Sequence, residues 1–192
     1  MNINEKKTIN GIKYFVKNTR NVGRTKLFKL LYFWDFRFFK KYGMSVTCYE
    51  YYTFPFGPVP LKLYDQIIND QLPESFMKEI AIDQIEYDED YDDSYKKFLV
   101  NNRNNKIDIS WFSPNEYSEL KEVAEIFKYA TAKEMTEISH LHNSPWDKTI
   151  QEHGYNYPID YFLAIDDEST LSNKEIEEYY TLQKEMCING RL

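Results

Sequence analysis

The segment from Lys26 to Lys41 constrains the fold more than any other part of the chain. Apolar residues recur in it at helical spacing along two stripes, one of Leu27, Leu30, Leu31, Trp34 and Phe38 and the other of Phe28, Tyr32, Phe36 and Phe39. A surface helix carries one such stripe, whereas a helix that is apolar on two sides must be covered by neighbours around most of its girth. We therefore expect a central helix that Thr25 caps and Gly43 ends.

Further helices are predicted by apolar spacing and by residues typical of helix ends. Ser113 to Glu116 and Thr131 to Glu134 have the spacing of a capping box, in which a hydroxyl and a glutamate bind each other's backbone amides. In the second of these helices, Met135, Ile138 and Leu141 are the apolar positions. The predicted helices other than the central one cover residues 6–18, 60–68, 73–80, 114–128, 132–141, 146–152 and 173–186.

Two segments are predicted to be extended. Val46 to Phe54 is rich in β-branched and aromatic residues and precedes a turn with three prolines and a glycine, Pro55 to Pro60. Phe98 to Val100 and Ile107 to Trp111 flank a polar turn and are predicted to pair as a β-hairpin. The fold class expected is mainly α (α+β), a compact helical domain with a small inserted β-hairpin or sheet.

The length of 192 residues suits one domain better than two. We expect that domain to span residues 1–165, followed by a C-terminal linker and helix over residues 166–192. No apolar run approaches the roughly 18 residues that cross a bilayer, and the polar start, Met1 to Lys7, lacks the apolar centre of a secretory signal. These features predict a soluble cytoplasmic protein without a membrane partner. Cys48 and Cys187 are interpreted as reduced, packed thiols, because two scattered cysteines do not make a disulfide framework.

The charge is unevenly distributed along the chain. The net charge is −7, yet residues 1–43 hold eleven Lys and Arg against two Asp and Glu, a local balance of +9. The basic third could meet nucleic acid or an acidic protein, or its lysines could form the solvated faces of two helices, which we favour. Because the whole chain is acidic, nucleic acid is unlikely as the main partner, and a protein partner fits better.

No pattern in the sequence predicts catalysis, and neither catalytic residues nor cofactors are assigned. The strongest candidate for chemistry is His140-x-His142, with Asp147 and His153, which could gather a metal in a hydrolase. Positions i and i+2 of a helix point about 200° apart, so both imidazoles would reach one ion only on an extended backbone. We favour histidines that bind carbonyl groups at helix ends, and no metal site.

Three stretches in order resemble the Panacea domain of SocA-like antitoxins. The first is Thr25 to Phe33, similar to the opening helix of that family with its Lys-Leu-x-Lys-Leu-Leu-Tyr pattern. The second is Tyr52 to Pro60, with Gly-Pro-Val after an aromatic residue, followed by Leu63-Tyr64. The third is Glu137 to Leu141 with Ser144-Pro145-Trp146, which resembles a Leu-Ser-x-x-Thr-His and Pro-Trp segment. The resemblance covers roughly residues 10–165.

The resemblance implies a helix-rich protein without catalytic residues or cofactors that suppresses a toxin encoded beside it, usually by direct binding. It implies a cognate toxin as partner and leaves the identity of the toxin open. A metal-dependent hydrolase and a regulator that uses residues 13–41 on DNA, or serves proteolysis as an adaptor, remain the alternatives. The chain could also form homo-oligomers.

Aromatic residues around the proline-rich turn are the candidates for partner binding. Interface energy concentrates in a few aromatic and arginine anchors, and Tyr49, Tyr51, Phe56 and Trp146 could serve as such anchors. Gly57 and Pro58 would fix the backbone of the turn. Phe56 and Trp146 could instead pack in the core under the turn; for Trp146 we favour the core, and for Phe56 both alternatives stay open.

Overall fold

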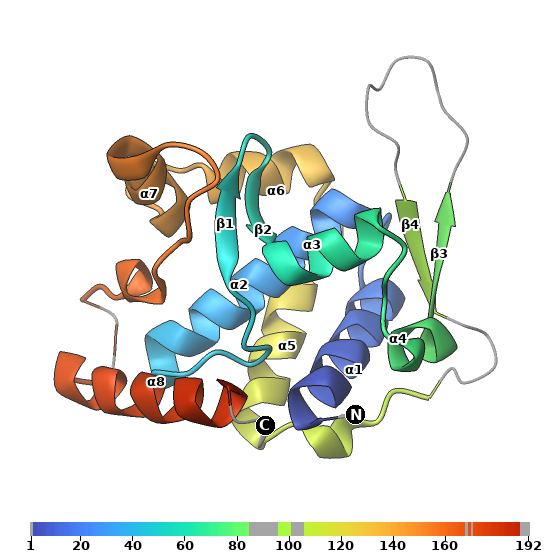
Figure 1. Cartoon of the computed structure of the whole chain (residues 1–192), viewed down its shortest axis with the longest axis horizontal. Helices are drawn as coiled ribbons and strands as arrows, with labels where there is room; N and C mark the ends of the chain where they lie inside the picture. The colour runs from blue at the N-terminus through green and yellow to red at the C-terminus, as the bar shows by residue number, and fades with distance from the viewer. Residues whose placement is uncertain (1, 85–95, 101–105, 168, 170, 189–192) are drawn as a thin grey trace.

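The computed structural model describes residues 2–84, 96–100, 106–167, 169 and 171–188. Helix α2 (Arg24–Tyr42) runs through the middle of the molecule, and the other elements are arranged around it (Figure 1). All nine apolar residues of its two stripes are buried, which confirms the central helix. Within the described ranges, no helix is long and apolar enough to cross a membrane.

Both ends of α2 are set by glycine. Gly43 ends the helix in the left-handed conformation, at φ 68°, as predicted. The predicted N-cap is wrong, because Gly23 occupies that position and Thr25 lies inside the first turn. The helix begins earlier than its polar pattern suggests, since the backbone amide of Leu27 already donates to the carbonyl of Gly23 at 2.9 Å.

Helix α1 (Ile3–Asn18) crosses α2 in close contact at Gly11. A Cβ atom at Gly11 would lie 2.5 Å from the Trp34 ring, so only glycine lets the two backbones approach this closely. The ring of Phe15 meets Trp34 edge to face at 5.9 Å. α1 begins at Ile3 rather than at residue 6 as predicted, because Asn2 caps it by accepting from the amide of Glu5.

Helices α5 (Pro114–Ile126), α6 (Ala132–Ser139) and α7 (Pro145–His153) follow in order after the middle of the chain (Figure 1). Both predicted capping boxes are confirmed, at Ser113 with Glu116 and at Thr131 with Glu134. α5 packs against both α1 and α2, and α6 packs against α2 and the nearby strand β2.

The first sheet is an antiparallel pair of β1 (Tyr51–Phe54) and β2 (Gly57–Pro60), in which Tyr51 pairs with Pro60. β2 leads directly into α3 (Leu61–Ile68). The strand is shorter than the predicted extended segment because the amides of Val46 and Thr47 donate to the Asp35 carboxylate instead of to a neighbouring strand.

The predicted hairpin of residues 98–100 with 107–111 is wrong. β4 (Lys96–Val100) pairs with β3 (Ile80–Gln84), which follows α4 (Glu74–Glu79), and Ile109–Trp111 forms the short 3₁₀ helix η2. Asp108 caps η2 by accepting from the amide of Ser110, and this local bond competes with a strand. The predicted polar turn of residues 101–105 lies outside the described residues.

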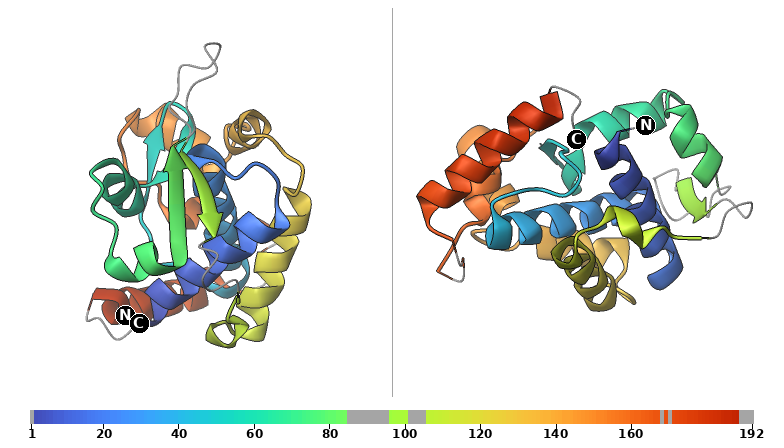
Figure 2. Two further views of the ribbon diagram at one scale, coloured as in Figure 1. Left: turned by 90° about the vertical axis from the view of Figure 1, so that its right-hand side faces the viewer. Right: turned by 90° about the horizontal axis from the view of Figure 1, so that it is seen from below.

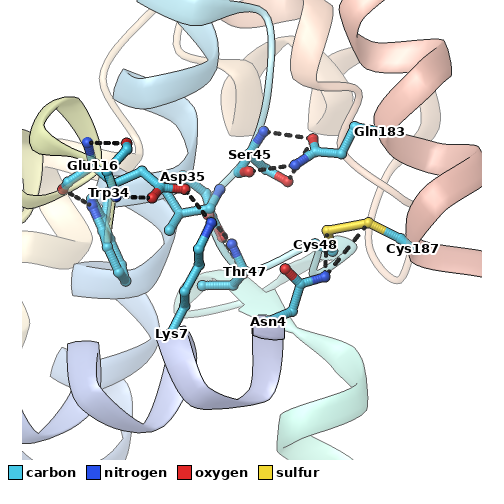
Figure 3. Close-up of polar contacts among 12 residues, drawn as sticks. Asn4, Lys7, Trp34, Asp35, Ser45, Thr47, Cys48, Glu116, Gln183 and Cys187 are labelled. Carbon is cyan, nitrogen blue, oxygen red and sulfur yellow. Dashed lines mark hydrogen bonds and ion pairs between the residues drawn. A yellow bond between two sulfur atoms is a disulfide. The ribbon is translucent and has the colours of Figure 1, made fainter. Parts of the chain in front are cut away.

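The C-terminal helix α8 (Asn173–Ile188) follows the 3₁₀ helix η3 (Tyr161–Ala164) in the chain. It lies beside the C-terminal end of α2 (Figures 1 and 2). Its Gln183 side chain accepts from the backbone amide of Ser45 at 2.8 Å and donates to the Ser45 carbonyl at 2.6 Å (Figure 3). Ile176 of α8 is fully buried. The domain boundary predicted at residue 165 stays a prediction, although the contacts of α8 tie it to the residues that follow α2.

The two cysteines form a disulfide between the loop before β1 and the end of α8 (Figure 3). The prediction of reduced, separately packed thiols is therefore wrong. Cys48 and Cys187 are 139 positions apart, and only the packing of α8 against residues 45–48 brings them together. Asn4 of α1 also lies here, with its amide nitrogen 3.0 Å from the Cys48 sulfur.

Cations of the first third of the chain pair with carboxylates of later segments. Lys7 reaches Glu116 at 2.6 Å, Lys13 reaches Glu79 at 2.8 Å, and Lys40 reaches Asp166 at 2.7 Å. Arg37 and Lys41 both contact Glu119 and Glu122 of α5. These cations are therefore neutralised by carboxylates of the same chain and do not form the solvated helix faces that we favoured.

Candidate partner-binding site

The turn between β1 and β2 presents one large apolar side chain to solvent. Phe56, at the tip of the turn, is 65% exposed. The next residue, Gly57, has φ 95°, a conformation that favours glycine. The turn is held against α6, where the Thr136 hydroxyl lies 3.4 Å from the Phe56 carbonyl. Of the six residues predicted to bind a partner, Phe56 has by far the most exposed ring.

A buried lysine supports the back of this turn. Lys29 of α2 is fully buried and donates to the Pro58 carbonyl at 3.0 Å. Burial lowers the pKa of the Lys29 ammonium from 10.5 to about 7, since a charge is costly away from water. A Cβ atom at Gly57 would lie 2.6 Å from both the Lys29 Cε and the Ser139 hydroxyl, so the turn packs directly on α2 and α6.

Trp146 supports the same turn from the side. It is 6% exposed, and its indole N–H donates to the Phe54 carbonyl at 3.2 Å. Its ring stacks on the His140 imidazole with centroids 3.7 Å apart. Trp146 therefore packs in the core, which is the alternative that we favoured, and it shapes the turn without facing solvent.

Tyr51 lies in a buried polar centre around Asp35. The Asp35 carboxylate accepts from the amides of Val46 and Thr47 at 2.7 and 2.9 Å and from the Thr47 hydroxyl (Figure 3). The Tyr51 hydroxyl is the fourth donor, at 2.7 Å. Burial raises the pKa of the Asp35 carboxyl to about 6, and these four hydrogen bonds oppose the rise. Because Tyr51 is fully buried, its ring is closed to a partner in this conformation.

Tyr49, Gly57 and Pro58, the remaining candidates for partner binding, are less exposed than Phe56. Tyr49 is half-buried, and its carbonyl accepts from the Tyr161 hydroxyl at 2.8 Å. Gly57 and Pro58 are buried β2 residues, which is consistent with a role in fixing the backbone. Contact of any of these residues with a partner stays a prediction.

The three histidines each contact a different residue. His140 stacks on Trp146, His142 lies 3.3 Å from a carboxylate oxygen of Asp147, and His153 stacks on Tyr157. Desolvation and the nearby Lys29 ammonium lower the pKa of His140. Among the residues that the structure describes, no three His, Cys, Asp or Glu side chains gather in a way that could hold a metal ion.

A groove between α5 and α6 was not predicted from the sequence. Met135 of α6 is fully buried, but Ile138 and Leu141, the other apolar positions of the helix predicted over residues 132–141, are 38% and 61% exposed. The helix ends at Ser139, so the chain turns away before Leu141 can follow Met135 into the core. Ile126 and Tyr129 face the same groove from the end of α5. Helical spacing alone could not reveal this exposure. It identifies the apolar positions of a helix but not which of them are covered by neighbouring elements.

Comparison with known families agrees with the resemblance found in the sequence. The model described as antitoxin SocA-like, Panacea domain, matches residues 27–147, which run from α2 to the first turn of α7. No curated protein and no solved structure matches the chain. The matched region holds the central helix from Leu27 onward, the turn at Phe56 and the groove between α5 and α6. The chain therefore belongs to the family of SocA-like antitoxins with a Panacea domain.

Proposed function

We propose that this protein is a cytoplasmic antitoxin that neutralises a toxin encoded beside it, by stoichiometric contact and without turnover of a substrate. The observation that carries the proposal is membership of the SocA-like antitoxin family over residues 27–147. A stiff turn with an exposed ring adds physical support, since interface energy concentrates in a few preorganised aromatic anchors. In this role Phe56 contacts the toxin, while Gly57, Pro58 and Trp146 hold its turn in place.

The test is expression of the neighbouring reading frame with and without this chain. We expect the neighbour to arrest growth alone, to be tolerated together with this chain, and to co-purify with it. Phe56→Ala is expected to weaken the complex about tenfold or more. Tyr179→Ala, which removes another exposed ring on α8, is the matched control and should leave binding unchanged. A neighbour that is harmless alone and does not bind would contradict the proposal.

A further inference from the structure

We propose that the groove between α5 and α6 receives the apolar side of a cationic amphipathic segment of the toxin. The inference rests on the proposed function and adds the surface and the chemistry of the partner to it. The groove has a volume of about 560 Å³ and is distinct from the turn at Phe56. Its occupant is argued from three properties of the groove, which are its apolar lining, its fixed shape and its charge.

The lining exposes more apolar surface than folding alone explains. Ile126, Tyr129 and Leu141 are 53%, 66% and 61% exposed, and Ile138 joins them. Single exposed apolar residues are ordinary, whereas several gathered around one hollow are typical of an interaction site. Phe127, which is buried, adds an aromatic wall and stacks on Phe33 of α2 at 4.7 Å.

Hydrogen bonds of Lys26 and Arg20 fix the shape of the groove before any partner arrives. The Lys26 side chain is fully buried, and its ammonium donates to the carbonyls of Arg20 at 2.8 Å and Ala130 at 2.6 Å. The amide of Arg20 donates to the Lys128 carbonyl at 2.8 Å. These bonds tie the connection between α5 and α6 to the start of α2. A preformed groove loses little conformational entropy on binding, which favours affinity.

The charge of the groove selects a cationic partner. Glu134 and Glu137 are the charged residues of its lining within the described part of the chain, and the Glu134 carboxylate also accepts from the Thr131 amide and hydroxyl. At the rim, Arg20 lies 4.8 Å and Lys128 5.7 Å from the Tyr129 ring centre, so these cations stack on the outer tyrosine. A segment with leucine-like residues on one side and lysine or arginine beside them would meet both the apolar lining and the two carboxylates.

A second copy of this chain fits the groove poorly. A two-fold contact places the same acidic patch of both copies in one interface, so the carboxylates of Glu134 and Glu137 would face a surface of like charge. Each copy also carries a net charge of −7, which opposes their encounter. Both arguments favour a partner of opposite charge over self-association.

Binding of variants to the co-purified toxin tests the proposal. Leu141→Ala with Ile126→Ala is expected to weaken binding about tenfold or more, because truncation removes two central apolar contacts. Glu137→Lys, at a side chain that forms no hydrogen bond with the residues that the structure describes, is expected to weaken binding and to reduce its dependence on salt. The matched controls on α8, Leu182→Ala and Glu177→Lys, are expected to change binding less than about twofold. Thermal unfolding of each variant checks that the fold is retained.

The outcomes separate this inference from the proposed function. If the toxin binds the wild-type chain and both groove variants equally well, the proposal that the groove binds the toxin is wrong, while the antitoxin function stands. If no toxin binds at all, the proposed function fails, and a synthetic helical peptide of leucines and lysines tests the groove itself. Binding of that peptide, lost in the double variant and absent for a leucine and glutamate peptide, supports the groove. Equal binding of both peptides, or a dimer that the double variant abolishes, overturns it.

Discussion

Asp35 shows how one side chain organises a stretch of irregular backbone. Its carboxylate accepts from the amides of Val46 and Thr47 and from the hydroxyls of Thr47 and Tyr51, so the segment after α2 is held without a neighbouring strand. A carboxylate only accepts, and all four groups that face it donate. An amide in its place would put a donor against donors. The chemistry of this single position thereby decides where β1 begins.

The first prediction concerns Asp35→Asn. The folded carboxyl has a pKa of about 6 and the unfolded one 3.8, so the folded state holds the proton more tightly. The contribution of Asp35 to stability is complete below pH 3.8 and falls as the pH rises through about 6, by roughly 3 kcal/mol. Urea unfolding from pH 4 to 7 should show this fall in the wild type relative to the variant. A pH profile shared by the wild type and Asp35→Asn would contradict the prediction.

The second prediction concerns Lys29→Met. The pKa of Lys29 is lowered from 10.5 to about 7, so the unfolded state binds more protons between these values. The wild type should therefore gain stability relative to the variant as the pH rises above 7, approaching about 1.4 kcal/mol per pH unit. Chemical unfolding between pH 6 and 9 measures this gain. A difference between the wild type and Lys29→Met that does not change with pH would argue against the depressed pKa of Lys29.

At the scale of elements, the turn between β1 and β2 depends on Gly57 for two separate reasons. Its φ of 95° strains any other residue, and a Cβ atom would meet the Lys29 Cε and the Ser139 hydroxyl at 2.6 Å. Gly154 has φ 80° but no atom within 4 Å of its would-be Cβ. The two glycines therefore separate backbone strain from side-chain crowding.

The third prediction compares Gly57→Ala with Gly154→Ala. The first is expected to lower the free energy of unfolding by about 2–4 kcal/mol, and the second by about 1 kcal/mol, because only the first adds a steric clash to the strain. Urea unfolding of both variants measures the difference. Equal losses would mean that the turn relaxes away from α2 without cost.

Local signals predicted helices well and long-range pairing poorly. The capping boxes at Ser113 and Thr131 are closed within four residues, so their sequence pattern is sufficient. The partner of β4 depends on contacts between residues 80–84 and 96–100, and the alternating apolar residues of Ile107 to Trp111 suggested the wrong one. The disulfide of Cys48 and Cys187 depends on the packing of α8, and no pattern near either cysteine in the sequence predicts it.

For the candidate site, the sequence identified the turn but not which rings face outward. Tyr51 and Phe56 look equally suited to binding in the sequence, yet Asp35 holds the first inside and the tip of the turn exposes the second. The groove between α5 and α6 exists because neighbouring elements leave some apolar residues of this region uncovered. Exposure of this kind is a property of the assembled fold, which spacing along one helix does not contain.

At the scale of the whole molecule, the side-chain amide of Gln183 attaches α8 to the backbone of Ser45. Gln183 is buried and satisfies both the amide and the carbonyl of Ser45. Loss of a partner leaves a buried polar group without hydrogen bonds, which costs about 1–3 kcal/mol for each group. The C-terminal helix therefore contributes to the stability of the residues that follow α2.

The fourth prediction concerns Gln183→Leu. The variant is expected to lose about 2–4 kcal/mol of stability, since it strands two buried backbone groups of Ser45. Faster hydrogen exchange of the Ser45 amide, with little change in α5, would locate the effect. Leu182→Ala, on the exposed side of the same helix, is the control and should cost less than about 0.5 kcal/mol. Unchanged exchange at Ser45 would count against a stabilising role for α8.

The pairing of early cations with late carboxylates has a consequence for biosynthesis. A ribosome releases α1 and α2 well before Glu116, Glu119 and Glu122, which pair with Lys7, Arg37 and Lys41. The apolar central helix and its positive charges thus emerge from the exit tunnel without the carboxylates that neutralise them. We expect nascent chains that stop before α5 to stay unfolded and open to proteolysis, so that the cell accumulates the protein only once its second half has been translated.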